Sequence, residues 1–163
     1  MIIAQSPCRD LKRHPTSVFL AGSITGADNW QQKAADEIAT WPIQGVIFNP
    51  RRKEWAESDP SNVIDKDRFR EQVEWELERI EGASQVLFNF VPGTLAPITL
   101  AEFGIRYTNL RYAGQLSAER NIVVCPEGFW RRGNVEIMCD RHGIALFSDM
   151  DIALIELKRR MVG

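Results

Sequence analysis

The sequence predicts an α/β fold: a doubly wound, five-stranded parallel sheet with helices on both faces. Short apolar runs alternate five times with amphipathic segments of helical length, and glycine- or proline-rich turns separate them. This βα rhythm predicts right-handed crossovers, and 163 residues suit a single domain over residues 1–163. The expected strands are 17–21, 45–49, 85–90, 121–125 and 144–147, and the expected helices are about 30–41, 71–82, 97–107, 134–141 and 152–160.

The first expected strand begins at residue 17, because residues 1–15 look like a loosely attached lead-in. Residues 17–21 (Ser-Val-Phe-Leu-Ala) are typical of a fully buried strand, which ends in a glycine-rich turn over residues 22–26. Asp28 is placed to cap the helix that follows. The turn lacks a complete dinucleotide or phosphate-loop motif. Its glycines therefore indicate either a tight turn or a close approach of the backbone to a ligand.

The later elements carry their own start and stop signals. Gly82 is a plausible residue to end the second helix, and Pro97 suits the first turn of the third. Gly143 is expected to break the fourth helix, and Asp149 can cap the last one. In parallel sheets ligands bind at the carboxyl ends of the strands. The expected ligand loops are therefore residues 22–30, 49–55, 91–99 and 126–134.

Composition excludes several classes of function. The net charge is −2 and the basic residues are dispersed, so neither a nucleic-acid partner nor a membrane surface is expected. No apolar run has the length of a membrane span, and the charged N-terminus does not resemble a signal peptide, so a cytoplasmic protein is expected. Three cysteines form no disulfide framework. Cys139, Asp140 and His142 are too few for a metal site, and we expect neither a metal nor a cofactor.

Two carboxylates interrupt apolar helical stripes. Glu76 lies within a stripe of the second helix, and Glu102 shares a face of the third helix with apolar neighbours. Burial of a carboxylate costs several kcal/mol unless it is paired. Either residue alone can simply extend into solvent from the edge of its stripe, but the pair, flanking one strand, predicts a catalytic site. The stripes are Phe69, Val73, Leu77 and Ile80 for Glu76, and Ile98, Ala101 and Ile105 for Glu102.

Four segments together resemble the nucleoside 2-deoxyribosyltransferase family, in particular its nucleoside 2-deoxyribosyltransferase-like branch. They are Val-Phe-Leu-Ala-Gly-Ser-Ile at 18–24, Phe-Asn-Pro-Arg-Arg at 48–52, Glu-Gln-Val-Glu-Trp-Glu at 71–76 and Pro-Ile-Thr-Leu-Ala-Glu-Phe-Gly at 97–104. The resemblance covers about residues 17–141. It implies a flavodoxin-like fold, a homo-oligomer (dimer or higher) with shared active sites, and nucleoside and nucleobase substrates.

The resemblance also implies roles for single residues. Glu102 matches the nucleophile that attacks the sugar, and Glu76 matches the acidic residue that handles the departing base. Asn134 matches an Asn that reaches the sugar of a neighbouring subunit. Where the family carries a sugar-binding Asp this chain has Ala96, so Thr99 or a backbone group is expected to substitute. The full set of expected substrate-binding residues is Gly22, Ser23, Ile24, Trp30, Asn49, Arg51, Thr99 and Asn134.

These residue types suit cleavage of an N-glycosidic bond. A carboxylate stabilises the positive charge that builds on the sugar and can form a covalent ester, while a second carboxyl group protonates the base. Arg51 can bind a phosphate or a base carbonyl, or pair with surface carboxylates. Three functions stay open: a deoxyribosyltransferase, a hydrolase of deoxynucleosides or their 5′-monophosphates, and a non-catalytic nucleotide-binding module. Expected wall residues, each of which can equally be ordinary core or surface, are Phe19, Ile24, Trp30, Trp55, Phe90 and Trp130.

Overall fold

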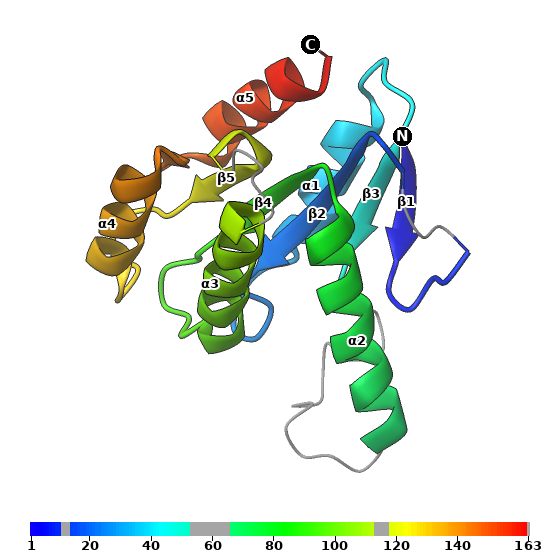
Figure 1. Cartoon of the computed structure of the whole chain (residues 1–163), viewed down its shortest axis with the longest axis horizontal. Helices are drawn as coiled ribbons and strands as arrows, with labels where there is room; N and C mark the ends of the chain where they lie inside the picture. Colours follow the sequence, from blue (N-terminus) through cyan, green and yellow to red (C-terminus); the bar gives the residue numbers. More distant parts are fainter. Residues whose placement is uncertain (11–13, 53–65, 113–117, 163) are drawn as a thin grey trace.

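The computed structural model describes residues 1–10, 14–52, 66–112 and 118–162, with the side chains of 109–112 left aside. It contains a six-stranded sheet in the order β1-β3-β2-β4-β5-β6, and every neighbouring pair is parallel (Figure 1). This confirms the α/β class and the parallel sheet. Trp55, an expected wall residue, lies outside the described residues. The strands are β1 (Ile2–Gln5), β2 (Ser17–Gly22), β3 (Val46–Asn49), β4 (Gln85–Asn89), β5 (Asn121–Val124) and β6 (Ala145–Phe147).

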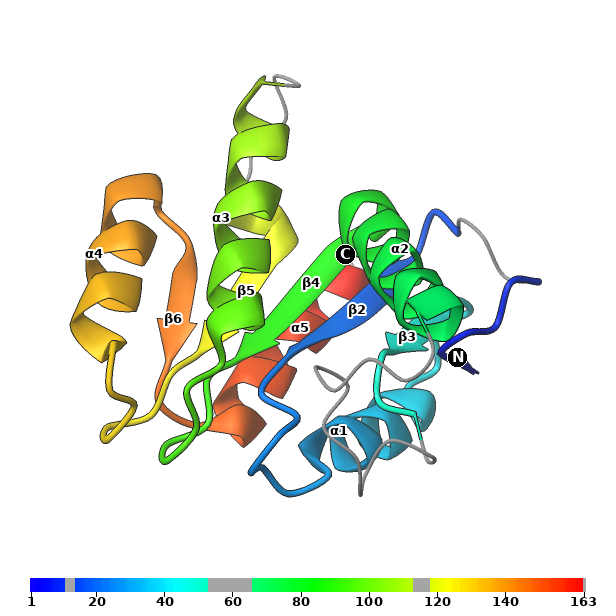
Figure 2. The same ribbon diagram turned by 90° about the horizontal axis from the view of Figure 1, so that it is seen from below.

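In the described ranges, five α-helices cover the two faces of the sheet, as a doubly wound fold requires. Figure 2 shows α2, α3 and α4 on one face and α1 and α5 on the other. A short 3₁₀-helix, Ala118–Arg120, precedes β5. The helices are α1 (Trp30–Ala39), α2 (Lys66–Gly82), α3 (Pro97–Tyr112), α4 (Arg132–His142) and α5 (Met150–Val162).

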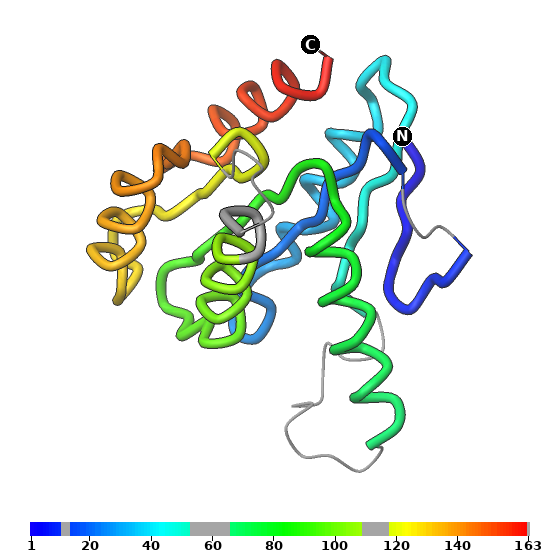
Figure 3. Tube along the Cα trace, in the orientation of Figure 1, coloured from blue at the N-terminus to red at the C-terminus, as the bar shows by residue number. Residues whose placement is uncertain are grey.

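The expected strand count of five was wrong, because the N-terminal residues are not a loose lead-in. Residues Ile2–Gln5 form β1, which pairs in parallel with β3 along its whole length, and Figure 3 shows this trace beside β3 at one edge of the sheet. Ile2 is exposed and Ala4 is buried. Four residues of an edge strand, buried on one side only, give too short an alternation to be recognised from sequence.

The helix ends follow the sequence signals with one exception. Asp149 accepts a hydrogen bond from the backbone N–H of Ile152, and Gly143 ends α4 in the left-handed conformation, with φ 65°. Asp28 was the wrong cap for α1. Instead the side chain of Asn29 accepts from the backbone N–H of Gln32 at 3.1 Å, which satisfies one of the free amides of the first turn.

Each face of the sheet has its own hydrophobic core. Beneath α2, α3 and α4 the core is aromatic: Phe88, Phe90 and Phe103 have ring centroids 5.1–6.5 Å apart. Phe19 and Phe90, two expected wall residues, are fully buried in this core. The second core, beneath α1 and α5, is mainly aliphatic. The aromatic core therefore supports the helices that carry Glu76 and Glu102.

The switch point of the sheet, where the strand order changes direction, lies between β2 and β4. The carboxyl ends of these two strands are in contact at Gly22. A Cβ atom on Gly22 would lie 2.5 Å from the carbonyl oxygen of Asn89 and 2.6 Å from Cζ2 of Trp30. The glycine is therefore required by the close approach of β4 and α1. Close packing of the protein on itself accounts for this glycine, a reason that neither interpretation of the turn had included.

We expect Gly22→Ala to destabilise the fold by about 1–3 kcal/mol, because the added methyl group displaces a backbone carbonyl in a packed region. Urea denaturation measures the change in the free energy of unfolding. Gly133→Ala is the matched control, since no atom lies within 4 Å of its added Cβ. Equal stability of the two variants would contradict the packing role of Gly22.

Candidate active site

Glu102 lies on the buried face of α3, one turn after Thr99 and one turn before Arg106. Its side chain is only 8% exposed, and within the described part of the chain no group hydrogen-bonds its carboxylate. Burial, and then the negative charge of Glu76, raise the pKa of Glu102 to about 8. A buried carboxylate without a partner is costly for stability, so its position indicates a function.

The face predicted for α3 was wrong, although the burial of Glu102 was right. Ile98 and Ile105 are 67% and 42% exposed, and Ala101 is exposed as well. The helix is rotated so that its apolar stripe faces away from the sheet. The residues that face inward are Thr99, Glu102, Phe103 and Arg106.

Glu76 lies on α2 and is partly buried. It accepts a hydrogen bond from the side-chain amide of Gln72. Burial raises its pKa to about 7, while the Gln72 hydrogen bond and the positive charge of Arg52 oppose that rise. The stripe predicted for α2 was wrong in part: Phe69 is exposed and Val73 and Leu77 are only half-buried. The buried face of α2 consists of Gln72, Trp75, Arg79 and Ile80.

The structure brings the two carboxylates to one place. Helices α2 and α3 pack side by side on the same face of the sheet (Figure 2), and the charge of Glu76 acts directly on the pKa of Glu102. Two carboxyl groups that repel each other lose their protons in separate steps. Near neutral pH the pair therefore holds about one proton, which gives one acid and one carboxylate in the same site.

Arg106 fixes the spacing of these two helices. Its buried guanidinium donates to the carbonyl oxygens of Ile80, Glu81 and Ala83, at the C-terminal end of α2, at 2.6–3.0 Å. Its Nε donates to Asn121 at the start of β5. Burial lowers the pKa of Arg106 to about 10, so the side chain stays charged at neutral pH. One residue thus joins the helix of Glu102 to the helix of Glu76.

Ser23, just after β2, links the first ligand loop to the loop before α3. Its buried hydroxyl is 2.7 Å from the hydroxyl of Thr94 and accepts from the backbone N–H of Val91. Thr94 in turn donates to the carbonyl of Val91. These bonds hold the two loops together at the carboxyl ends of β2 and β4.

A comparison with protein families shows which family the chain belongs to. Residues 15–129, more than half of the chain, match the family described as "Nucleoside 2-deoxyribosyltransferase like". The chain belongs to this family. No curated protein matches the chain. Membership implies a glycosyl-transfer enzyme with nucleoside substrates.

The family match runs from the start of β2 to the loop after β5, and so it includes both Glu76 and Glu102. β1, α4 with Asn134, and α5 lie outside it. None of the helices in the described ranges combines the length and apolar character of a membrane span. Nor do three or more His, Cys, Asp or Glu side chains of those ranges form a group able to hold a metal ion.

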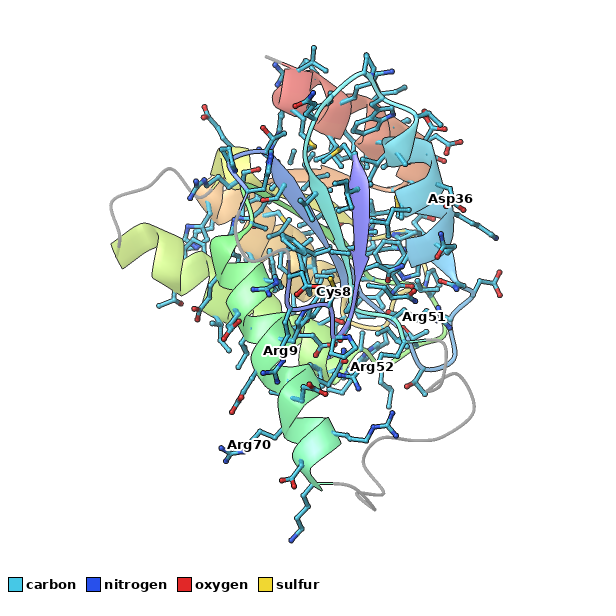
Figure 4. All side chains as sticks on the ribbon, turned by 90° about the vertical axis from the view of Figure 1, so that its right-hand side faces the viewer. Cys8, Arg9, Asp36, Arg51, Arg52 and Arg70 are labelled. Carbon is cyan, nitrogen blue, oxygen red and sulfur yellow. The ribbon has the colours of Figure 1, made fainter. Side chains whose placement is uncertain are left out.

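Three residues expected to bind the nucleoside make hydrogen bonds that support the first ligand loop. The guanidinium of Arg51 donates to the carbonyl oxygens of Asp28 and Ala27 at 2.8 and 3.0 Å, and Figure 4 shows Arg51 beside this loop. The side chain of Asn49 accepts from the backbone N–H of Arg51. Trp30 donates from Nε1 to the carbonyl of Ser23 at 2.9 Å. For Arg51 these contacts favour neither a phosphate nor a surface carboxylate, since carbonyls of its own chain bind it.

Trp30 faces the side of the sheet opposite to the two carboxylates. It lines a groove of about 640 Å³ between α1 and α5, together with Trp41, Asn89 and Leu154. The loop that it supports is nevertheless the one that carries Gly22, Ser23 and Ile24, of which Ile24 is half-buried. Trp30 therefore supports, through its bond to Ser23, the loop that carries these three residues.

Thr99 and Asn134 occupy different surroundings. Thr99 is 4% exposed and precedes Glu102 by three residues on the same inward face of α3. Asn134 is exposed in the first turn of α4. Trp130, the exposed wall candidate, donates to the carbonyl of Leu95 and so ties the loop before α4 to the loop before α3.

Ala96, where the resemblance led us to expect a sugar-binding Asp, has a left-handed backbone with φ 45°. This conformation costs an ordinary residue about 1–2 kcal/mol, whereas Asp and Asn visit it more readily. Asp or Asn would therefore adopt this conformation of the loop more readily than Ala does. Nothing in the sequence pattern indicates this strain.

Three residues that contact Glu76 or join the two helices were not predicted from the sequence: Gln72, Arg52 and Arg106. All three are polar and at least nine-tenths buried. Gln72 precedes Glu76 by one helical turn, which was the available signal. Arg52 lies at the start of a polar loop, where basic residues are normally solvated, and nothing in its sequence context distinguishes it.

Proposed function

We propose that this protein transfers the 2-deoxyribosyl group between nucleobases through a covalent ester on Glu102. The observation that carries the proposal is a buried carboxylate without a hydrogen-bond partner in the described residues, beside a second carboxyl group. Family membership supports the same class of substrate. A binding module that only holds a nucleotide has no need of two destabilising carboxylates in one site.

The proposed reaction has two displacements. A carboxylate oxygen of Glu102 forms a bond to C1′ as the bond from C1′ to the base nitrogen breaks, and the electron pair leaves with the base, which takes a proton from Glu76. A second base then attacks C1′ and gives its proton to Glu76, while the ester bond to Glu102 breaks. Two inversions retain the configuration at C1′. Each carboxyl group returns to its starting state.

The proton shared by the pair provides both roles. In the free pair the single proton resides mainly on Glu102, which has the higher pKa. The positive charge that develops on the sugar favours the ionised form of Glu102, so the proton moves to Glu76, where the base departs. Because Glu76 and Glu102 titrate with pKa values of about 7 and 8, the singly protonated pair is most abundant between those values.

We therefore expect kcat/KM to show a bell-shaped pH profile with its maximum between about pH 7 and 8. Below this window both carboxyl groups are protonated and no nucleophile is present, whereas above it both are ionised and no acid is present. Initial rates from pH 5 to 10 measure the profile. A rate that stays constant down to pH 5 would contradict a catalytic pair with raised pKa values.

Incubation with deoxyinosine and adenine, followed by separation of the products, tests the function. The transferase predicts deoxyadenosine and hypoxanthine, and faster release of hypoxanthine when adenine is added. A hydrolase predicts free deoxyribose and hypoxanthine at a rate independent of adenine. The absence of base exchange and of free base across several purine and pyrimidine donors would refute both enzymatic functions.

The proposal includes an oligomer in which Asn134 reaches the site of a neighbouring subunit. Large apolar side chains are exposed on and near α3 and α4, where a single chain leaves them in water: Leu95, Ile98, Trp130 and Ile137 are all more than half exposed. Such residues together commonly mark a protein interface. Sedimentation of the active enzyme tests this arrangement, and a strictly monomeric active protein would refute it.

A further inference from the structure

The N-terminal segment, which lies outside the family match, is joined to the helix that carries Glu76. The carbonyl of Cys8 accepts from Nε1 of Trp75 at 2.9 Å, and Arg9 pairs with Glu71 at 3.1 Å. Ser6 is 6% exposed, and its hydroxyl donates to Oε1 of Gln72 at 2.5 Å. Figure 4 shows Cys8, Arg9 and Arg52 gathered at one end of the sheet beside α2.

These contacts fix the orientation of the Gln72 amide. Its oxygen accepts from Ser6, so its nitrogen must point the other way, where it donates to the carbonyl of Pro50 at 3.0 Å and to Glu76 at 2.5 Å. Ser6 itself accepts from Nε of Arg52 at 3.3 Å. The hydrogen bonds run in one direction, from the charged Arg52 through Ser6 and Gln72 to the carboxylate. Bonds aligned in this way polarise and strengthen one another.

We propose that Ser6 and Gln72 are positioning residues that hold Glu76 as the proton donor and acceptor of the site, so that the N-terminal segment is part of the catalytic apparatus. This inference rests on the proposed function. Ser6 acts through Gln72, and neither residue needs to touch the substrate. If Ser6 is absent, the amide of Gln72 can turn over and present its oxygen to Glu76, which disfavours the ionised form.

Several charged groups near Glu76 also influence whether its carboxyl group is ionised. Arg52, from the loop after β3, favours the ionised carboxylate of Glu76, and the negative charge of Glu76 in turn raises the pKa of Glu102 on α3. Glu71, which is partly exposed on α2, forms an ion pair with the same Arg52 at 3.5 Å. The hydrogen bond that Gln72 donates to Glu76 opposes the rise in pKa that burial causes. The amide therefore keeps Glu76 able to release its proton near neutral pH.

The test measures the pKa of Glu76 directly, from the carboxyl ¹³C shift assigned with Glu76→Gln, in the full-length protein. We expect Gln72→Leu to raise this pKa by about one pH unit, and Ser6→Ala to raise it by less. Ser17→Ala is the matched control, because Ser17 is equally buried and hydrogen-bonded but lies at the opposite end of the sheet. It should lower Tm without moving the pKa of Glu76.

The acid side of the pH profile of kcat/KM should move in parallel with the pKa in both variants. An unchanged pKa of Glu76 in Ser6→Ala and Gln72→Leu, with a loss of Tm like that of Ser17→Ala, would show a purely structural role and overturn the inference. The two proposals fail separately. If the wild-type protein shows no turnover, the proposed function fails, while the titration still decides whether Ser6 and Gln72 tune Glu76.

Discussion

Glu102→Gln is expected to lower the rate of base exchange by about a thousandfold or more, because the amide cannot attack C1′. The same substitution should stabilise the protein at alkaline pH. Gln has nearly the same size and shape as Glu but carries no charge, so the cost of burying an ionised group disappears. Opposite effects on activity and stability distinguish a catalytic residue from a structural one.

The sign of the stability effect follows from the pKa of Glu102, which is raised from 4.5 to about 8. Between these values the folded protein binds more protons than the unfolded chain, so the stability of the wild type falls as the pH rises through this window. At pH 5 the variant and the wild type should be nearly equal. Above pH 8 the variant should be more stable by up to about 5 kcal/mol, if the whole pKa difference is expressed.

Urea denaturation of both proteins at pH 5 and pH 9 measures this difference, and base exchange is assayed in parallel. Glu119→Gln is the control, since Glu119 is exposed in the 3₁₀-helix before β5. It should change neither activity nor the pH dependence of stability. Near-normal exchange by the Glu102 variant would remove Glu102 from the mechanism.

The sequence predicted only part of this site, because hydrophobic periodicity indicates where helices and strands lie but not which face of a helix is buried. Of the elements in the part of the chain that the structure describes, the alternation of apolar runs predicted five of six strands and all five α-helices. The carboxylates stood out because Glu is rarely buried. The helix faces were harder. On α3 the stripe around Ile98 and Ile105 is as apolar as a core-facing stripe, but it is exposed, and only its packing partners decide which face turns inward.

Buried polar residues escaped sequence analysis for a related reason. Arg106 is the largest side chain among those less than 2% exposed, and Ser6 and Gln72 are nearly as buried, yet each type is usually found at the surface. Their burial depends on carbonyls and hydroxyls that come from distant parts of the chain. Tertiary structure brings these partners together, and no local sequence pattern around the buried residues predicts them.

Arg106→Met is expected to destabilise the fold by about 3 kcal/mol or more. The substitution keeps an apolar stem but leaves the carbonyls of Ile80, Glu81 and Ala83 without their charged donor, and buried carbonyls that lose a partner are costly. For a chain of this size the loss corresponds to a fall in Tm of about 6–12 °C. Differential scanning calorimetry measures it.

The loss should extend to activity, although the hydrogen bonds of Arg106 go to backbone carbonyls and Asn121 and not to either carboxylate. With the clamp removed, the end of α2 is free to shift relative to α3, and a carboxyl group displaced by about 1 Å from its partner can cost on the order of a hundredfold in rate. Arg70→Met is the matched control, because the ion pair between Arg70 and Glu74 on the same helix is exposed. If Arg106→Met melts like this control and exchanges bases at the wild-type rate, the two helices do not depend on Arg106 for their spacing.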